Sequence, residues 1–117
     1  MKRAILLAGL SMLAAPPAFA HAYLTNAVPA KGSTVQTPPS QLELFYTEEV
    51  VPHFSSVVVE NAQRHPIHTG ALRVSQDKHE VIVPVPKLAP GKYTVVWHMT
   101  AEDTHKTQGT YSFTVAD

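Results

Sequence analysis

His21 is the residue in this sequence whose type and position predict metal chemistry most directly. It follows Ala18-Phe19-Ala20, an A-x-A pattern typical of signal-peptide cleavage sites, so that cleavage after Ala20 makes His21 the amino terminus. A terminal histidine offers an α-amine and an imidazole Nδ1, which together close a chelate ring on one metal ion. These two nitrogens would fill two of the in-plane positions that a tetragonal Cu(II) ion prefers.

A second set of metal donors lies in Asp103-Thr104-His105. If this stretch is extended, Asp103 and His105 point to the same face, about 7 Å apart along the backbone, and both can reach one ion. With His21 the donor set becomes three nitrogens and one oxygen, which favours Cu(II) over other divalent first-row metals. Alone, an Asp-x-His triplet is more typical of a turn with an exposed histidine, so the metal interpretation depends on His21.

Residues 1–20 are predicted to be a secretory signal peptide. Lys2 and Arg3 form its charged start, and residues 4–15 form an apolar segment that is too short to span a bilayer. No later run of the sequence approaches the roughly 18 apolar residues of a membrane span. We therefore expect residues 21–117 to be one soluble, exported domain of periplasmic type.

The composition of this domain excludes several classes of function. The sequence has nine basic and nine acidic residues, and removal of Lys2 and Arg3 leaves a slightly acidic chain without a basic block, so nucleic-acid binding is not expected. There are no cysteines, which excludes thiolate metal sites, cysteine nucleophiles and disulfide support for the fold. Seven histidines are many for so short a chain.

The elements that must position these donors are predicted to be short β-strands. About seven segments alternate apolar and polar residues or are rich in valine, and turn residues separate them: 23–28, 41–46, 54–60, 71–74, 80–85, 92–100 and 109–115. Pro84 and Pro86 predict that their segment is an edge strand or ends early. The pattern favours an all-β fold, an antiparallel sandwich or a partly open Greek-key barrel.

Two of these segments also indicate what fills the core. Trp97 and Met99 lie on the apolar face of the 92–100 segment, and we expect both to be buried. Gly91 and Gly109 are interpreted as turn or strand-boundary residues.

The sequence resembles the CopC family of periplasmic copper-binding proteins over essentially all of residues 21–117. Several spaced motifs carry this resemblance in the order typical of the family: His21, PAKGS (29–33), LELFYTE (42–48), LAPGKYTVVW (88–97), Asp103-Thr104-His105, and Gly109 with YSFTV (111–115).

The resemblance implies an immunoglobulin-like Greek-key β-barrel that binds Cu(II), one ion per mature chain. It assigns His21, Asp103 and His105 as the metal ligands and places Glu48 near the copper, as an outer or weak axial ligand. It also implies an inner-membrane copper transporter of the CopD type as the partner. Nothing in the sequence requires more than a monomer.

The sequence departs from some family members in one respect. Those members add a Cu(I) site built from a methionine-rich loop, but residues 61–75 of this chain contain no methionine. Because soft Cu(I) prefers thioether sulfur, this chain resembles the members that have a Cu(II) site only.

The remaining histidines have weaker assignments. His65 and His68 form an H-x-x-H pattern that suits a weak secondary site, although loop histidines are more commonly only solvated. His53 and His79 have no clear partner and are interpreted as surface residues. His98 points away from Trp97, either to support the copper site from outside its ligands or to face water.

Three classes of function remain open on these grounds. The leading hypothesis is a binding protein, not an enzyme, that sequesters or carries Cu(II) for copper homeostasis, resistance or import. The second is a copper monooxygenase, because such enzymes also chelate copper with a terminal histidine. The third is a metal-free immunoglobulin-like interaction module, in which His21, Asp103 and His105 would have no functional role.

Overall fold

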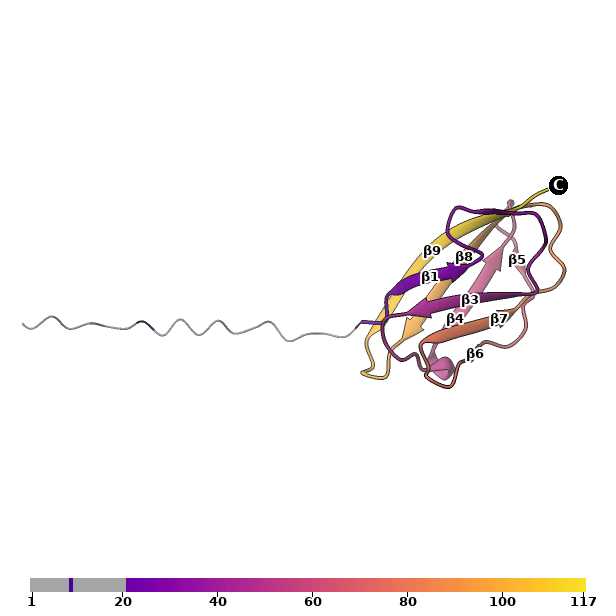
Figure 1. Ribbon diagram of the computed structural model, residues 1–117. Helices are drawn as coiled ribbons and strands as arrows, with labels where there is room; N and C mark the ends of the chain where they lie inside the picture. Colours follow the sequence, from indigo (N-terminus) through magenta and orange to yellow (C-terminus); the bar gives the residue numbers. More distant parts are fainter. Residues whose placement is uncertain (1–8, 10–20) are drawn as a thin grey trace, which may run out of the picture.

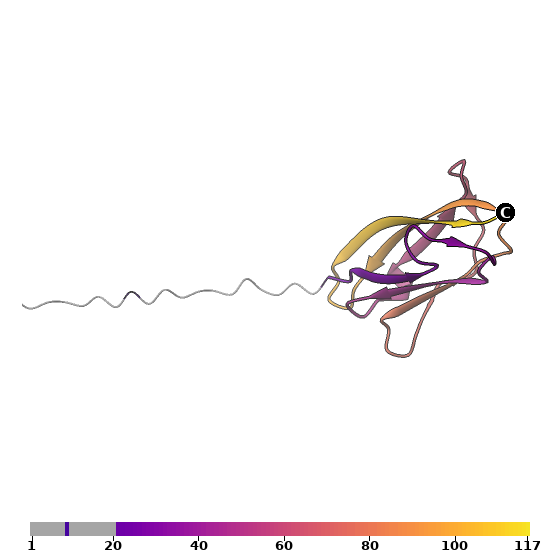
Figure 2. The ribbon, with the colours of Figure 1, turned by 45° about the horizontal axis from the view of Figure 1, so that its top comes forward.

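The protein folds as a sandwich of two β-sheets (Figures 1 and 2). The computed structural model describes Gly9 and residues 21–117. The predicted signal peptide, residues 1–20, lies outside the described residues apart from Gly9. Within the described part of the chain, no helix is long and apolar enough to cross a membrane.

The first sheet has four strands in the order β1-β3-β7-β6, and neighbouring strands are antiparallel. In this order the strands are β1 (Leu24–Val28), β3 (Gln41–Tyr46), β7 (Glu80–Pro84) and β6 (Arg73–Val74). The longest pairing joins β3 to β7 and runs from Gln41 opposite Pro84 to Phe45 opposite Glu80.

The second sheet has five strands in the order β2-β9-β8-β4-β5, and only the β2–β9 pair is parallel. These strands are β2 (Thr34–Val35), β9 (Lys106–Val115), β8 (Gly91–Thr100), β4 (Ser56–Glu60) and β5 (Pro66–Ile67). One short 3-10 helix, η1 (Pro52–Phe54), precedes β4. The β8–β9 hairpin is the longest pairing of this sheet, from Gly91 opposite Val115 to Thr100 opposite Lys106.

The core lies between the sheets and follows directly from the period of the sequence. Alternate side chains of β3, β8 and β9 are buried because successive residues of a strand point to opposite faces. The buried apolar side chains of these three strands are Leu42, Leu44, Tyr46, Tyr93, Val95, Trp97, Met99, Tyr111, Phe113 and Val115. The prediction that Trp97 and Met99 belong to the core is confirmed.

The expectation of an all-β sandwich is confirmed, and each of the seven predicted segments contains a strand. The sequence pattern missed β2 and β5, which have two residues each and are too short to show a period. It also placed the start of the last strand too late, since β9 begins at Lys106. Of the two interpretations of Pro84, the early end is correct: β7 lies between two strands but stops at this residue.

Gly109 is not a boundary residue, as the sequence suggested, but lies inside β9 directly opposite Trp97 of β8. The Trp97 indole covers it so closely that a Cβ atom at position 109 would lie 2.5 Å from Cζ2 of the ring. Trp97 also packs edge-on against Tyr46, with ring centroids 5.4 Å apart, and so joins the two sheets. A glycine is needed here because any side chain would displace this indole.

We expect Gly109→Ala to lower the free energy of unfolding by about 1–3 kcal/mol, because the added methyl overpacks the core against Trp97. Urea unfolding followed by Trp97 fluorescence measures the change. Thr110→Val is the matched control: Thr110 is the exposed neighbour of Gly109 in the same strand, and the change keeps a β-branched side chain. An equal loss of stability in both variants would contradict the packing explanation.

Candidate metal centre

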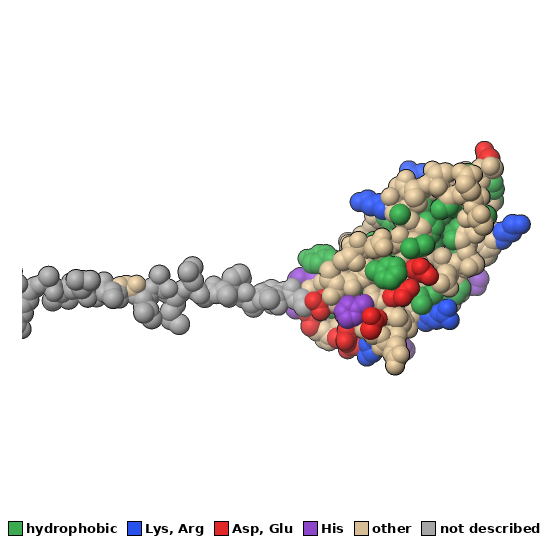
Figure 3. Space-filling model, viewed as in Figure 1, with side chains coloured by type: hydrophobic (Ala, Val, Ile, Leu, Met, Phe, Trp, Pro, Cys, Tyr) green, Lys and Arg blue, Asp and Glu red, His purple; other side chains and the backbone are tan. Residues whose placement is uncertain are grey.

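Three segments that are far apart in the sequence meet at one end of the sandwich (Figure 1). They are residues 21–23, the loop that follows β3 (residues 47–51), and the turn between β8 and β9 (residues 101–105). Backbone hydrogen bonds join the loop to the end of β8, from Val51 N–H to Thr100 O at 2.8 Å, and to the turn, from Glu102 N–H to Glu49 O at 3.1 Å. Acidic and histidine side chains gather over this end of the molecule (Figure 3).

Hydrogen bonds from threonine hydroxyls to the backbone fix residues 21–23 between the two sheets. The Thr47 hydroxyl donates to the carbonyl oxygen of His21 at 2.8 Å and accepts the N–H of Tyr23 at 3.0 Å. The Thr107 hydroxyl donates to the carbonyl oxygen of Ala22 at 2.7 Å. Since the Ala22 side chain is fully buried in the core, the segment next to His21 is a fixed part of the fold.

Asp103 and His105 come together by a different route from the one predicted. The stretch is a tight turn, not an extended strand: Thr104 has a φ of 75°, and its N–H donates to Ala101 O at 2.9 Å. This turn folds the Asp103 carboxylate back onto its neighbour, so that Oδ1 accepts the His105 N–H at 3.1 Å. Oδ2 lies 3.0 Å from His105 Nδ1.

The His21 and His105 rings lie side by side, with centroids 4.9 Å apart. The pKa of the Asp103 carboxyl lies below its usual range because it accepts hydrogen bonds from the side chain and backbone of His105, and proximity to His21 lowers it further. The three predicted ligands therefore share one neighbourhood. The contact with Asp103 occupies Nδ1 and leaves Nε2 of His105 for a metal ion, so Asp103 can bind the same ion only if its carboxylate turns away from Nδ1.

The described residues do not contain three His, Cys, Asp or Glu side chains already arranged around a common metal position. In the full chain the His21 nitrogen belongs to a peptide bond with Ala20, and only cleavage turns it into an amine donor. A carboxylate oxygen, imidazole nitrogens and an amine are the ligand types that Cu(II) favours, so the residues present fit the ion.

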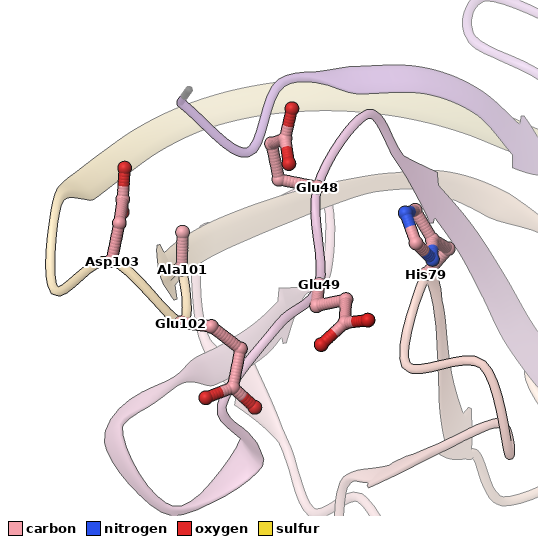
Figure 4. A pocket seen from close by; sticks show the side chains of 6 residues that line it. All are labelled: Glu48, Glu49, His79, Ala101, Glu102 and Asp103. Atoms are coloured by element: carbon pink, nitrogen blue, oxygen red, sulfur yellow. The ribbon is translucent and has the colours of Figure 1, made fainter. Parts of the chain in front are cut away.

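A cavity of about 300 Å³ lies beside this cluster (Figure 4) and is lined mostly by acidic residues. The lining residues are Glu48, Glu49, His79, Ala101, Glu102 and Asp103. The carboxylates of Glu48 and Asp103 point to one side of the cavity, whereas that of Glu102 points to the other and pairs with Lys78 at 3.1 Å. This placement puts Glu48 next to the candidate centre, where it increases the negative potential that attracts cations.

Four of the other histidines are exposed on the surface. His98 is exposed on the outer face of β8, opposite Trp97, so it faces water. His65 and His68 are exposed on either side of β5, and residues three apart on extended backbone point in opposite directions. His53 is exposed in η1, as expected.

Sequence reasoning missed three features of this end of the molecule. His79 was interpreted as a surface residue without a partner, but it is half-buried, its Nδ1 lies 2.9 Å from Asp77 O, and it lines the acidic cavity. The roles of Thr47 and Thr107 were missed as well. No sequence signal marks either threonine, because each acts on the backbone of a segment that is distant in the chain.

Fold and site together define a class of protein: a small two-sheet sandwich with paired histidines and an aspartate at one end. The CopC domain family matches residues 24–116, nearly all of the domain. The chain belongs to the CopC family.

Known relatives agree with this assignment. Protein YobA of Escherichia coli K12 is 39% identical over 105 residues, which cover 88% of this chain and 85% of that protein. Copper resistance protein C of Escherichia coli is 32% identical over 123 residues, covering 98% of this chain and 97% of that protein. The crystal structure of CopC from Methylosinus trichosporium OB3b superimposes with a TM-score of 0.78 at 28% identity, covering 82% of this chain and 94% of that one.

The aspartate–histidine pair predicts a shifted titration in the metal-free protein. We expect the pKa of Asp103, measured by carbon-13 NMR, to lie below the value of about 3.9 for an unperturbed aspartate, and to rise toward it in His105→Ala. A carboxyl whose pKa is lowered by folding stabilises the fold above its unfolded pKa, and this contribution disappears as the pH falls through the folded pKa.

Asp77 supplies an internal control in the same spectra. Its pKa is also lowered, chiefly by the Ser75 hydroxyl and the His79 backbone, so His105→Ala should leave it unchanged. An Asp103 pKa that does not respond to His105→Ala would show that the pair does not form.

Proposed function

We propose that this chain is a periplasmic Cu(II)-binding protein that sequesters or carries copper. In this proposal residues 1–20 are a signal peptide, residues 21–117 are the mature copper-binding domain, and one ion binds per mature chain. The ligands are the α-amine and imidazole of His21, the imidazole of His105 and the carboxylate of Asp103. Glu48 acts from outside this plane, as a weak axial or outer ligand.

The observation that carries the proposal is the contact between the His21 and His105 rings, at 4.9 Å between centroids. The two residues are far apart in the sequence, and the fold brings their rings together beside the carboxylate of Asp103. Holding two histidines next to an aspartate costs conformational entropy, since each of the three side chains loses freedom there. The printed names of relatives, such as copper resistance protein C, support copper as the metal.

The donor set favours holding the ion over catalysis. Two nitrogens of His21, one of His105 and an oxygen of Asp103 would fill the plane of a tetragonal Cu(II) ion and leave little room for a substrate. The ligand types also favour Cu(II) over Cu(I), which prefers sulfur. Met99 is 1% exposed in the core and does not reach the surface where the histidines lie.

The partner that we propose is an inner-membrane copper transporter of the CopD type, which the family resemblance implies. The position of the site supports transfer to such a partner. The proposed ligands lie at one end of the sandwich, where the side chains of Asp103 and His105 keep exposed fractions of 36% and 41%. A partner can therefore approach the ion without opening the fold.

Copper titration of the protein that begins at His21 tests the proposal. We expect one tightly bound Cu(II) ion with a tetragonal, nitrogen-rich electron paramagnetic resonance (EPR) signal and with quenching of Trp97 fluorescence. In a protein with one residue added before His21, the nitrogen of His21 is an amide and the terminal amine belongs to the added residue. This protein should bind at least tenfold more weakly, because His21 can no longer chelate through its own amine and imidazole. His105→Ala should also weaken binding, whereas His98→Ala, which removes an exposed histidine of β8, should not.

Each result decides between the classes of function. Weak binding that is indifferent to the added residue would contradict the proposal and favour a metal-free interaction module. Tight binding together with oxidised sugar products, formed in the presence of a reductant, would favour a monooxygenase instead.

Copper affinity should fall as the pH is lowered. Metal binding requires a deprotonated amine, and an unperturbed α-amine has a pKa of about 7.7–8.0, so protons compete with copper below that range. The amine alone predicts a loss of about tenfold in apparent affinity per pH unit, with a steeper loss once imidazoles also protonate. Competition titrations between pH 5 and 8 measure this slope. A flat profile would show that the amine is not a ligand.

A further inference from the structure

We propose that Thr47 and Thr107 are positioning residues that hold the backbone of residues 21–23 and so preform the terminal chelate. This inference rests on the proposed function, because it concerns how the amine and imidazole of His21 are presented to Cu(II). Neither threonine touches the ion in this proposal. Each acts through a hydrogen bond to a backbone group of the terminal segment.

Thr47 lies at the end of β3 and holds two residues of the segment with one side chain. Its hydroxyl donates to the His21 carbonyl oxygen at 2.8 Å and accepts the Tyr23 N–H at 3.0 Å. Its own N–H donates to the Tyr23 carbonyl oxygen at 3.0 Å. Three hydrogen bonds from one residue fix the peptide planes on both sides of Ala22.

Thr107 holds the same segment from the other sheet. Its hydroxyl donates to the Ala22 carbonyl oxygen at 2.7 Å, from the second position of β9. Ala22 is 0% exposed. Removal of the Thr107 hydroxyl would therefore leave the Ala22 carbonyl oxygen without this partner. The segment is thus held from both sheets at consecutive residues.

The bond to His21 also selects among chelate modes. A terminal amino acid can bind Cu(II) through its amine and its own carbonyl oxygen, as well as through amine and imidazole. The Thr47 hydroxyl donates to the His21 carbonyl oxygen and holds it turned toward Thr47, so an ion that binds through this oxygen competes with the hydrogen bond. The imidazole mode keeps all of these bonds, and the fold therefore favours the nitrogen-rich site.

Each threonine shares a segment with another residue of the site. Thr47 directly precedes Glu48, and Thr107 lies two residues after His105. Their hydrogen bonds therefore fix the distance from His21 to the segments that carry the other ligands. Chain termini are ordinarily the least ordered part of a domain, and ordering this one in advance removes that cost from copper binding.

The test compares Thr47→Val and Thr107→Val with Thr47→Ser and Thr107→Ser in the protein that begins at His21. Valine keeps the shape of threonine but removes the hydroxyl, whereas serine keeps the hydroxyl. We expect each valine variant to lower Cu(II) affinity by about three- to tenfold, as expected for the loss of one or two hydrogen bonds, and each serine variant to restore it. The EPR spectrum of Thr47→Val should also shift toward fewer nitrogen donors.

Thr25→Val is the matched control. The Thr25 hydroxyl of β1 donates to the Phe45 carbonyl oxygen of β3 at 3.1 Å. This bond holds no part of residues 21–23. The control variant should leave copper affinity and the EPR spectrum unchanged. Urea unfolding of the metal-free variants measures how much stability each hydroxyl contributes, so that affinity is compared only among folded proteins.

A second background isolates the role in positioning. In the protein with one residue added before His21, His21 has no amine of its own to orient, and the valine variants should cause no further loss of affinity. Equal losses in both backgrounds, or unchanged affinity in the valine variants, would overturn the inference while leaving the copper site intact. Failure of the parent protein to bind copper would instead contradict the proposed function.

Discussion

The pairing of β8 with β9 is the interaction on which the rest of the structure depends. Its register runs unbroken from Gly91 opposite Val115 to Thr100 opposite Lys106, so the position of the 101–105 turn is fixed by the whole length of the hairpin. Within it, the Trp97 indole lies over Gly109 and reaches Tyr46 of the other sheet. In a chain without disulfides, this packing keeps the turn and the two sheets in one arrangement.

The β8–β9 hairpin alone cannot supply all the residues of the candidate centre. The turn provides an aspartate and a histidine that bond to each other, and the second histidine has to come from the beginning of the domain. Hydroxyl groups from both sheets hold that beginning in place through its backbone. The surrounding carboxylates then give this end of the sandwich a negative potential, which favours cations of any kind. Selectivity must therefore come from the nitrogen donors and their geometry.

Much of this could be predicted from the sequence. Apolar patterns predicted the six strands of five or more residues and the segment that contains the two-residue β6, since one face of each strand must be buried. The order of the family's motifs also predicted that His21, Asp103 and His105 lie near one another, although not the turn that joins Asp103 to His105. The two-residue strands β2 and β5 and the close contact at Gly109 could not be predicted, since they depend on partners from elsewhere in the chain. The bend at Thr104 is of the same kind: its backbone conformation is uncommon for threonine, and residue type alone favoured an extended segment.

The fully buried Ala22 has a consequence for the lifetime of a protein that begins at His21. An aminopeptidase must draw the first residues of its substrate into an active site in extended form before it can cut. Here the carbonyl oxygens of His21 and Ala22 accept hydrogen bonds from Thr47 and Thr107, and the methyl group of Ala22 is buried in the core. In a protein that begins at His21, removal of this residue would require local unfolding of β1 and its neighbours, so the fold would protect from trimming the residue on which the proposed copper site depends.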